Sequence, residues 1–195
     1  MLHPRMFDPD ILAPDGIRKL SRREYDKLVE LGVFEDERVE LLRGMLVTMS
    51  PQGGPHSAIT AWLAQRLTRL LDESYDIRAH SPFAATEDSE PEPDVSVSRR
   101  APGNFEHPDS ALLLIEVSES SIKKDRLLKA PIYGESHVPE YWIVDISGTD
   151  LLVHVHTRAA SDGYRHIETL RDGDVLRPTK LAGIEIAVAD IPWAR

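Results

Sequence analysis

The clearest periodic pattern in the chain lies between residues 55 and 74. Apolar side chains recur there at helical spacing, and Arg66 and Arg69 fall off the apolar stripe. The stripe consists of Ile59, Trp62, Leu63, Leu67, Leu70 and Leu71. This spacing predicts an amphipathic helix that packs on a sheet.

Two shorter elements are predicted before this helix. Residues 21–32 predict a short helix in which Ser21 is the N-cap, Glu24 completes a capping box and Gly32 ends the helix. Residues 38–49 contain two short, largely apolar runs on either side of Arg43-Gly44, which predicts a hairpin.

Strands are predicted over most of the remaining chain. Apolar or alternating runs predict strands at 75–80, 94–98, 111–117 and 140–146, followed by antiparallel strands at 150–157, 164–170 and near 184–188. The proline-marked acidic segment 82–93 predicts a loop. Residues 121–136 are helical in pattern, and Pro131 predicts a kink or a division into two short helices.

The order of these elements predicts one α/β or α+β domain over residues 1–195. It contains a mixed sheet flanked by helices, an N-terminal hairpin and a C-terminal antiparallel extension over 150–190. Residues 1–18 show no periodicity, and we expect them to form an irregular arm. A glycine-rich phosphate loop is absent from the sequence, which disfavours a nucleotide-binding doubly wound fold.

Composition narrows the chemistry. The sequence has 33 Asp and Glu against 23 Lys and Arg, a net charge of -10, which argues against a general cationic surface that coats nucleic acid. It has no cysteine, which excludes disulfides and cysteine-based nucleophiles or metal sites. The longest apolar run, at 111–115, is too short to span a bilayer. We therefore expect a cytoplasmic protein without a membrane partner.

Two carboxylates stand in unusual places. Glu116 comes at the end of a strand that is apolar on both faces, and Asp94 opens the preceding strand. If these strands pair antiparallel, the two carboxylates converge at one edge of the sheet, where they would share a Mg²⁺ or Mn²⁺ ion. The alternative is that Glu116 turns to solvent and Asp94 is a turn residue after Pro93. Spacing alone slightly favours that alternative.

Several segments carry a resemblance to a known family. They are VELLRGMLVTMSPQGGPHSAI at 39–59, Pro93-Asp94, IEVSES at 115–120 and KKDRLLKAPIYGESHVPEYWIVD at 123–145. Over residues 21–157 the chain resembles the Uma-two-type family, a bacterial group placed with restriction endonucleases in the PD-(D/E)xK nuclease superfamily. The resemblance implies a restriction-endonuclease-like core of helix, three strands, helix and strand, which is the order predicted above for residues 55–146.

The resemblance also implies an active site. Asp94 would be the PD aspartate and Glu116 the acid of E-x-K, both binding Mg²⁺ (or Mn²⁺), with the Val117 carbonyl as a third metal ligand. Ser118 stands where the lysine of E-x-K is expected. Lys129, on the following helix, would be its substitute, and the alternative is that Lys129 is an ordinary solvated helix lysine. Lys123 and Lys124 are the competing lysines.

Two further residues are implied by the same resemblance. Glu40 matches an early acidic residue and would be another metal ligand, while His56 would contact the metal-bound water or a phosphate. For His56 the alternative is a residue that only closes the first helical turn. His154 and His156 share a strand face and would make half a metal site, but a polar strand face is the better interpretation.

The function implied is a Mg²⁺-dependent endonuclease that hydrolyses phosphodiester bonds of nucleic acid. DNA is the expected substrate. Residues 123–129 and Arg99-Arg100 would supply a local basic patch for the phosphate backbone. The missing E-x-K lysine and the acidic balance support an alternative, a catalytically inactive nuclease-fold module that binds nucleic acid or protein. A homodimer built on the C-terminal strands is a third hypothesis.

Overall fold

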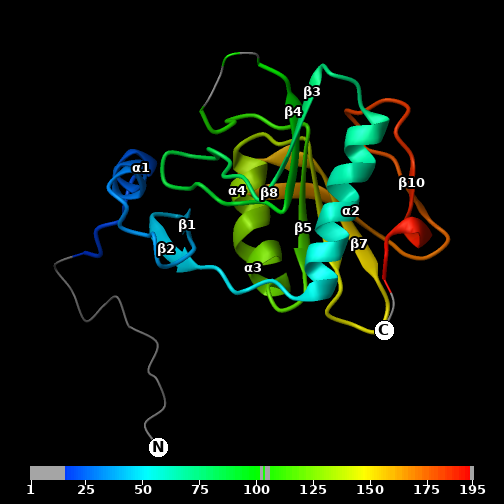
Figure 1. The fold of residues 1–195 in the computed structure, drawn as a ribbon, viewed down its shortest axis with the longest axis horizontal. Helices are drawn as coiled ribbons and strands as arrows, with labels where there is room; N and C mark the ends of the chain where they lie inside the picture. Colours follow the sequence, from blue (N-terminus) through cyan, green and yellow to red (C-terminus); the bar gives the residue numbers. More distant parts are fainter. Residues whose placement is uncertain (1–15, 102, 104–105, 194–195) are drawn as a thin grey trace, which may run out of the picture.

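The structure, a computed structural model, describes residues 16–101, 103 and 106–193. Its centre is a six-stranded sheet with the spatial order β3-β4-β5-β6-β7-β8 (Figure 1). The strands are β3 (Tyr75–Ala79), β4 (Val95–Arg99), β5 (Leu113–Ser118), β6 (Glu140–Asp145), β7 (Leu152–Ala160) and β8 (Gly163–Leu170). Neighbouring strands run antiparallel except β5 and β6, which are parallel. The predicted mixed sheet is confirmed.

The parallel pair requires a crossover, and a helical segment supplies it. This segment consists of α3 (Ile122–Lys124), a π-helical turn η2 (Asp125–Lys129) and α4 (Ala130–Glu135). In the π turn the Ala130 N–H donates to the carbonyl of Asp125. The sequence predicted a kink or two helices at Pro131, whereas the helical path continues through a wider turn just before it. Pro131 has no N–H with which to donate an α-helical hydrogen bond. The wider turn therefore loses no hydrogen bond that Pro131 could have made.

The sheet is covered on both faces. Helix α2 (Gly54–Leu70) lies on one face and the crossover on the other, as Figure 1 shows. Alternate residues of β5 divide between them. Leu113, Ile115 and Val117 pack with α2, while Leu114 packs with α4. The predicted helix extended to residue 74 but ends at Leu70, because Asp72 accepts a hydrogen bond from the Ser74 N–H and turns the chain.

The N-terminal elements form as predicted. Helix α1 (Arg22–Glu30) begins with the Ser21–Glu24 capping box, and Gly32 follows its end at a φ of 73°. Strands β1 (Val39–Leu42) and β2 (Met45–Thr48) form the hairpin. Its turn, Arg43-Gly44, has positive φ at both residues, which matches the twist of a two-residue hairpin. For the predicted arm, residues 1–15 lie outside the described residues, and residues 16–18 have no regular structure.

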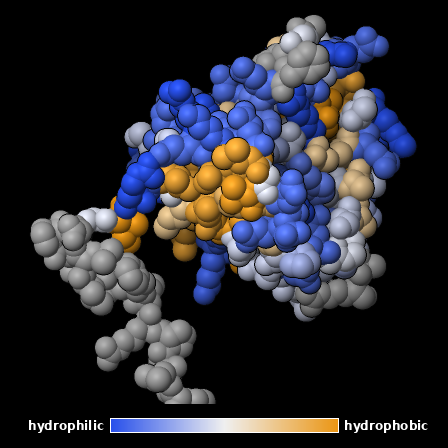
Figure 2. Space-filling view, turned by 60° about the vertical axis from the view of Figure 1, so that its left-hand side comes forward, coloured by the Kyte–Doolittle hydropathy of each residue, from blue (hydrophilic) through white to orange (hydrophobic). Residues whose placement is uncertain are grey.

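The hairpin and α1 carry the main exposed apolar area. Figure 2 shows it on the side of the molecule that bears these elements. Its side chains are Val29, Leu31, Val33, Met45 and Leu46. Beneath it, a hydrogen bond from the Tyr25 hydroxyl to the Val39 carbonyl joins α1 to the hairpin.

The C-terminal extension differs in part from the prediction. Strands β7 and β8 continue the main sheet, but the last strands, β9 (Val175–Leu176) and β10 (Ile186–Ala187), form a separate two-stranded sheet. The short helix η3 (Val188–Asp190) follows. This segment packs in the same apolar cluster as α2, where two-residue strands suffice to bury Leu176 and Ile186. Within the described part of the chain, no helix has the length and hydropathy that crossing a membrane requires.

Candidate active site

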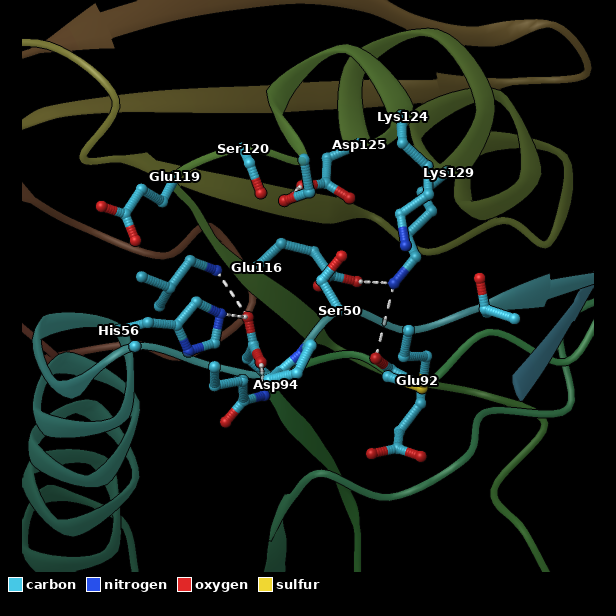
Figure 3. A pocket seen from close by; sticks show the side chains of 17 residues that line it. Ser50, His56, Glu92, Asp94, Glu116, Glu119, Ser120, Lys124, Asp125 and Lys129 are labelled. Carbon is cyan, nitrogen blue, oxygen red and sulfur yellow. Dashed lines mark hydrogen bonds and ion pairs between the residues drawn. The ribbon is translucent and has the colours of Figure 1, made fainter. Parts of the chain in front are cut away.

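A pocket of about 280 Å³ opens where β5 ends and β4 begins. Its walls come from the loop between β2 and α2, the first turn of α2, the facing ends of β4 and β5, and the start of the crossover (Figure 3). The pocket is lined by five carboxylates, from Glu92, Asp94, Glu116, Glu119 and Asp125, but only two lysines, Lys124 and Lys129. The wall chemistry therefore favours a cation.

Asp94 and Glu116 both line this pocket. Strands β4 and β5 pair antiparallel with Val95 opposite Ile115, so Asp94 lies beside the end of β5, as the sequence predicted. The Val117 N–H donates to Asp94 Oδ2 over 2.7 Å, which fixes the carboxylate at the strand ends. Gln52 Nε2 donates to the other oxygen over 3.2 Å. Neither carboxylate turns out to solvent, so the alternative arrangement is not the one observed.

Glu116 points to the crossover side of the sheet. Its Oε1 lies 2.8 Å from Lys129 Nζ and accepts a 2.9 Å hydrogen bond from the Tyr133 hydroxyl. Burial raises the pKa of Glu116 well above its ordinary value, although the Lys129 ammonium acts in the opposite direction. A cation placed beside this carboxylate would therefore favour its charged form.

Lys129 is the lysine that reaches the carboxylates. Its ammonium lies 2.8 Å from Glu116 and 2.9 Å from Glu40, and it donates to the Glu92 carbonyl over 3.4 Å. The side chain is 2% exposed, so it is not a solvated helix lysine. Burial acts to lower the pKa of Lys129, but the two carboxylates outweigh it and raise the pKa above its ordinary value. Of the competing lysines, Lys123 is exposed and does not line the pocket.

Glu40 lies behind the lysines and does not line the pocket. Its Oε1 lies 2.6 Å from Lys124 Nζ and its Oε2 lies 2.9 Å from Lys129 Nζ. Burial acts to raise the pKa of Glu40, but the two ammonium groups outweigh it and hold the pKa below its ordinary value. The expectation of Glu40 as a metal ligand is thus not supported by its position. Its carboxylate is directed to lysines because the hairpin turns this strand position inward.

His56 stands in the first turn of α2 and faces Asp94. Its Nε2 lies 3.1 Å from Asp94 Oδ2, and its buried Nδ1 has no partner among the described residues. Burial acts to lower the pKa of His56, but the hydrogen bond and charge of Asp94 outweigh it and raise the pKa. His56 therefore contacts a residue of the pocket, and its role is not limited to the first turn of the helix.

Other site residues were not selected from the sequence. Gln52 and His80 approach Asp94, Tyr133 binds Glu116, and Ser118 and Asp125 bind one another. Tyr133 had a signal, because it follows Lys129 by four residues. Gln52 and His80 had none, since both belong to irregular loops whose path follows no period.

The predicted basic patch does not form. Arg99 and Arg100 lie at the end of β4 remote from Asp94, where Arg99 stacks over Tyr75. The basic residues of 123–129 are mostly engaged: Lys124 and Lys129 bind Glu40, while Arg126 contacts His154 and Asp145. Helix periodicity divides this run among several faces, so four charges in sequence do not make a shared surface.

The two strand histidines form no metal site. His154 contacts Thr169 and Asp145, and His156 contacts the His154 carbonyl. Burial lowers the pKa of both imidazoles. Over residues 16–101, 103 and 106–193, no group of three or more His, Asp or Glu side chains could hold a metal ion.

A family model matches residues 22–189, and its description is Uma2, "Putative restriction endonuclease". The chain belongs to this family. The family resemblance predicted from sequence is confirmed, and the match includes every site residue described above. A comparison with curated proteins gives no match.

A solved structure shares the fold of this Uma2 family member. It is a "putative nuclease belonging to DUF820" from Anabaena variabilis. The TM-score is 0.70 at 15% identity, and the alignment covers 88% of this chain and 97% of the other. The predicted restriction-endonuclease-like mixed sheet with flanking helices is therefore confirmed as a fold.

Restriction endonuclease-like proteins generally use divalent metals, and the pocket of this Uma2 protein suits one. Asp94 and Glu116 offer oxygen ligands, which Mg²⁺ and Mn²⁺ prefer. Mg²⁺ is commonly held by one or two carboxylates together with substrate phosphate and water, so a full protein cage is unnecessary. The excess of carboxylates over ammonium groups around the pocket agrees with this donor set.

Proposed function

We propose that the protein is a Mg²⁺- or Mn²⁺-dependent endonuclease that hydrolyses phosphodiester bonds of DNA. The observation that carries this proposal is the position of Lys129, buried against Glu116 in the same pocket that Asp94 lines. A carboxylate pair with a fixed ammonium is the combination expected for charge stabilisation at a scissile phosphate. Membership of a family described as restriction endonucleases supports the same reaction.

Asp94, Glu116 and the Val117 carbonyl would hold the metal. A divalent ion bound there supplies Lewis acidity to the phosphate and a bound water of lowered pKa. The Val117 N–H and Gln52 orient Asp94 for this purpose. Glu40 has a different role from the metal ligation expected from sequence, because it holds Lys129 from the side opposite Glu116.

Lys129 can reach substrate without losing its ion pairs. Its contacts to Glu116 and Glu40 are 2.8 and 2.9 Å, whereas its bond to the Glu92 carbonyl is 3.4 Å and therefore the weakest of the three. Exchange of that last bond for a phosphate oxygen would leave the two carboxylates in place. His56, held against Asp94 on the opposite wall, offers a second donor near the same phosphate.

The test uses plasmid, duplex and single-stranded DNA and RNA oligonucleotides, with Mg²⁺, Mn²⁺ or EDTA. Metal-dependent cleavage by the wild type is expected. Lys129→Met, Asp94→Asn and Glu116→Gln should each lower kcat by about 10²–10³, the usual loss when one charge-stabilising group is removed. Glu119→Gln is the matched control, because Glu119 lines the same pocket but is exposed. Cleavage that survives in Asp94→Asn and Glu116→Gln would refute the site.

The alternative function is a catalytically inactive nuclease-fold module that binds nucleic acid or protein. The full engagement of the Lys129 ammonium by three protein acceptors favours it, as does the net charge of -10. It predicts no cleavage under any metal and no rise in melting temperature with Mg²⁺. Isothermal titration with Mg²⁺ separates the two functions, since binding that disappears in Asp94→Asn counts against the inactive module.

Association into a homodimer is a separate proposal. The C-terminal strands suggested from sequence expose Ile167, whereas the larger exposed apolar area lies on α1 and the hairpin. Light scattering over a range of protein concentrations measures the state directly. A strict monomer would exclude duplex cutting by a stable pair of these chains.

A further inference from the structure

Asp125 is a buried carboxylate that the proposed reaction does not use. It is 1% exposed, and its Oδ2 accepts hydrogen bonds from the Ser118 and Ser121 hydroxyls, each over 2.6 Å. Its Oδ1 is buried without a partner among the described residues. Because a buried charge is costly unless it is hydrogen-bonded, this arrangement requires a physical explanation.

The two serines come from different elements. Ser118 is the last residue of β5, two positions after Glu116, so both side chains leave the strand on the same face. Ser121 belongs to the turn that starts the crossover, and its carbonyl also accepts the Asp125 N–H over 3.0 Å. The Ser118 bond therefore links strand to helix, whereas the Ser121 bond stays within the helix start.

Asp125 and Lys129 stand at the two ends of the π turn. One end is joined to β5 through Asp125 and Ser118, and the other through Lys129 and Glu116. These two links close a ring that contains the last three residues of β5 and the five residues of the turn. The Ser118 link adds to the contacts of Lys129 with Glu116 and Glu40, and it ties the other end of the turn to β5.

We propose that Ser118 and Asp125 form a brace that positions Lys129 against Glu116. In the E-x-K motif this strand position supplies the lysine. Here the position is Ser118, which instead holds the helical segment that supplies Lys129. Ser118 and Asp125 are positioning residues, since neither is required to touch the substrate. This inference rests on the proposed function only for its effect on cleavage, because the position of the Lys129 amine can be measured without any substrate.

The chain offers a matched pair of variants. Ser118→Ala and Ser121→Ala each remove one 2.6 Å hydroxyl donor from the same carboxylate oxygen, but only Ser118→Ala cuts the link from strand to helix. Ser118→Thr restores the hydroxyl and serves as the conservative rescue. Asp125→Asn keeps the volume and weakens the acceptor, so it replaces Ser118→Ala if that variant fails to fold by circular dichroism.

The first readout is the rate of reductive methylation of Lys129 in the metal-free protein, followed by peptide mass spectrometry with the exposed Lys123 as internal reference. Ser118→Ala should raise the Lys129 rate at least about tenfold, and Asp125→Asn should raise it too, while Ser121→Ala and Ser118→Thr stay near the wild type. Equal methylation rates of Lys129 in Ser118→Ala and Ser121→Ala would refute the proposed brace. An unchanged methylation rate in Asp125→Asn would refute it too.

The second readout is cleavage kinetics. Ser118→Ala should lower kcat about tenfold or more with KM within threefold, because a misplaced catalytic group affects the reaction more than substrate binding. Ser121→Ala should keep kcat within threefold, and Ser118→Thr should restore it. Equal loss of kcat in both alanine variants would also overturn the brace. If the wild type cleaves no substrate, the proposed function fails, and the methylation rates alone still decide the brace.

Discussion

At the scale of single residues, the site depends on one buried ammonium shared by two acids. Lys129 lies between Glu116 and Glu40, and all three side chains are nearly inaccessible to water. Removing these charges from water is costly. The fold can bury them only because the attraction between the ammonium and the carboxylates offsets that cost. Removal of one partner from the Glu116–Lys129–Glu40 cluster should therefore destabilise the fold as well as impair the proposed chemistry.

Replacement of the lysine tests this directly. We expect Lys129→Met to lower the free energy of unfolding by about 3–5 kcal/mol near neutral pH, since it leaves the buried Glu116 without an ammonium partner, whereas Glu40 keeps Lys124. The deficit should be larger at pH 8 than at pH 5, because without Lys129 burial raises the pKa of Glu116 further and its protonated form favours the folded state. Urea denaturation at the two pH values measures it.

The control for that experiment is Lys123→Met. Lys123 is exposed on the same helical segment, and its loss should change stability by less than about 0.5 kcal/mol. A Lys129→Met protein as stable as Lys123→Met at pH 8 would contradict the compensation described for the cluster.

Prediction from sequence succeeded for residues whose position follows from strand geometry. Asp94 and Glu116 were brought together by one argument, that the start of a strand lies beside the end of its antiparallel neighbour. Lys129 was selected among three lysines through the family resemblance. Glu40 was selected, but its contact with Lys124 was not predicted, because the contact spans 84 residues of sequence and no local pattern encodes such a pairing.

At the scale of elements, glycine at a close approach decides where α4 can lie. A Cβ on Gly134 would meet the carbonyl oxygen of Gly163 at 2.1 Å, at the start of β8. Alanine is favoured over glycine in helices by about 1 kcal/mol, but overpacking against backbone costs about 1–3 kcal/mol. We therefore expect Gly134→Ala to be destabilising in spite of its helix propensity.

Thermal unfolding of Gly134→Ala and Gly54→Ala measures this balance. Gly54 begins α2, and a Cβ there would meet nothing within 4 Å, so its variant should be as stable as the wild type or slightly more stable. An increase in melting temperature for both variants would show that α4 is not held against β8 as closely as described.

The capping box of α1 should make the stability of this helix depend on pH. The Ser21 N–H, the Arg18 guanidinium and the Ser21 hydroxyl lower the pKa of Glu24 from 4.5 to about 2. A carboxyl with a depressed folded-state pKa contributes stability that is present above pH 4.5 and lost as the pH falls toward 2. Protection of the α1 amides from hydrogen exchange, relative to those of α2, should therefore fall over this window.

In Glu24→Gln the relative protection of α1 should be lower at pH 5 and should lose most of its dependence on pH. A wild-type protein whose α1 protection stays constant from pH 4.5 to 2.5 would contradict the cap as described.

The elements themselves were largely predictable, and the exceptions have physical causes. Helix α1 and the hairpin followed from capping and turn residues with fixed conformational preferences. The π turn did not, since it depends on contacts to β5 as well as on Pro131. Strand β9 has only two residues, too few to show a period.

At the scale of the whole molecule, a net charge of -10 limits how nucleic acid can bind. Among the described residues, Lys124 and Lys129 are engaged by Glu40, and Arg126 contacts His154 and Asp145, so we expect these side chains to neutralise few phosphates. Affinity should then depend on the divalent ion proposed at Asp94 and Glu116 more than on counterion release. We expect binding to a phosphorothioate oligonucleotide to strengthen at least tenfold when EDTA is replaced by Mg²⁺.

The salt dependence provides the matching measurement. Six to ten phosphate contacts reduce affinity by about 10³–10⁵ between 50 and 200 mM salt, and we expect a much smaller reduction here. Fluorescence anisotropy at constant Mg²⁺ measures the slope. A slope typical of six or more contacts would show that a basic surface outside the described contacts engages the backbone.

The contacts that build the pocket differ widely in their separation along the chain, and this has a consequence for folding kinetics. The Lys129–Glu116 contact joins residues 13 apart, the Val117–Asp94 contact joins residues 23 apart, and the Lys124–Glu40 contact joins residues 84 apart. Closing a longer loop costs more chain entropy, so distant contacts tend to form later. The hairpin that carries Glu40 is therefore expected to dock last, and refolding protein would regain the sheet before it regains a complete site.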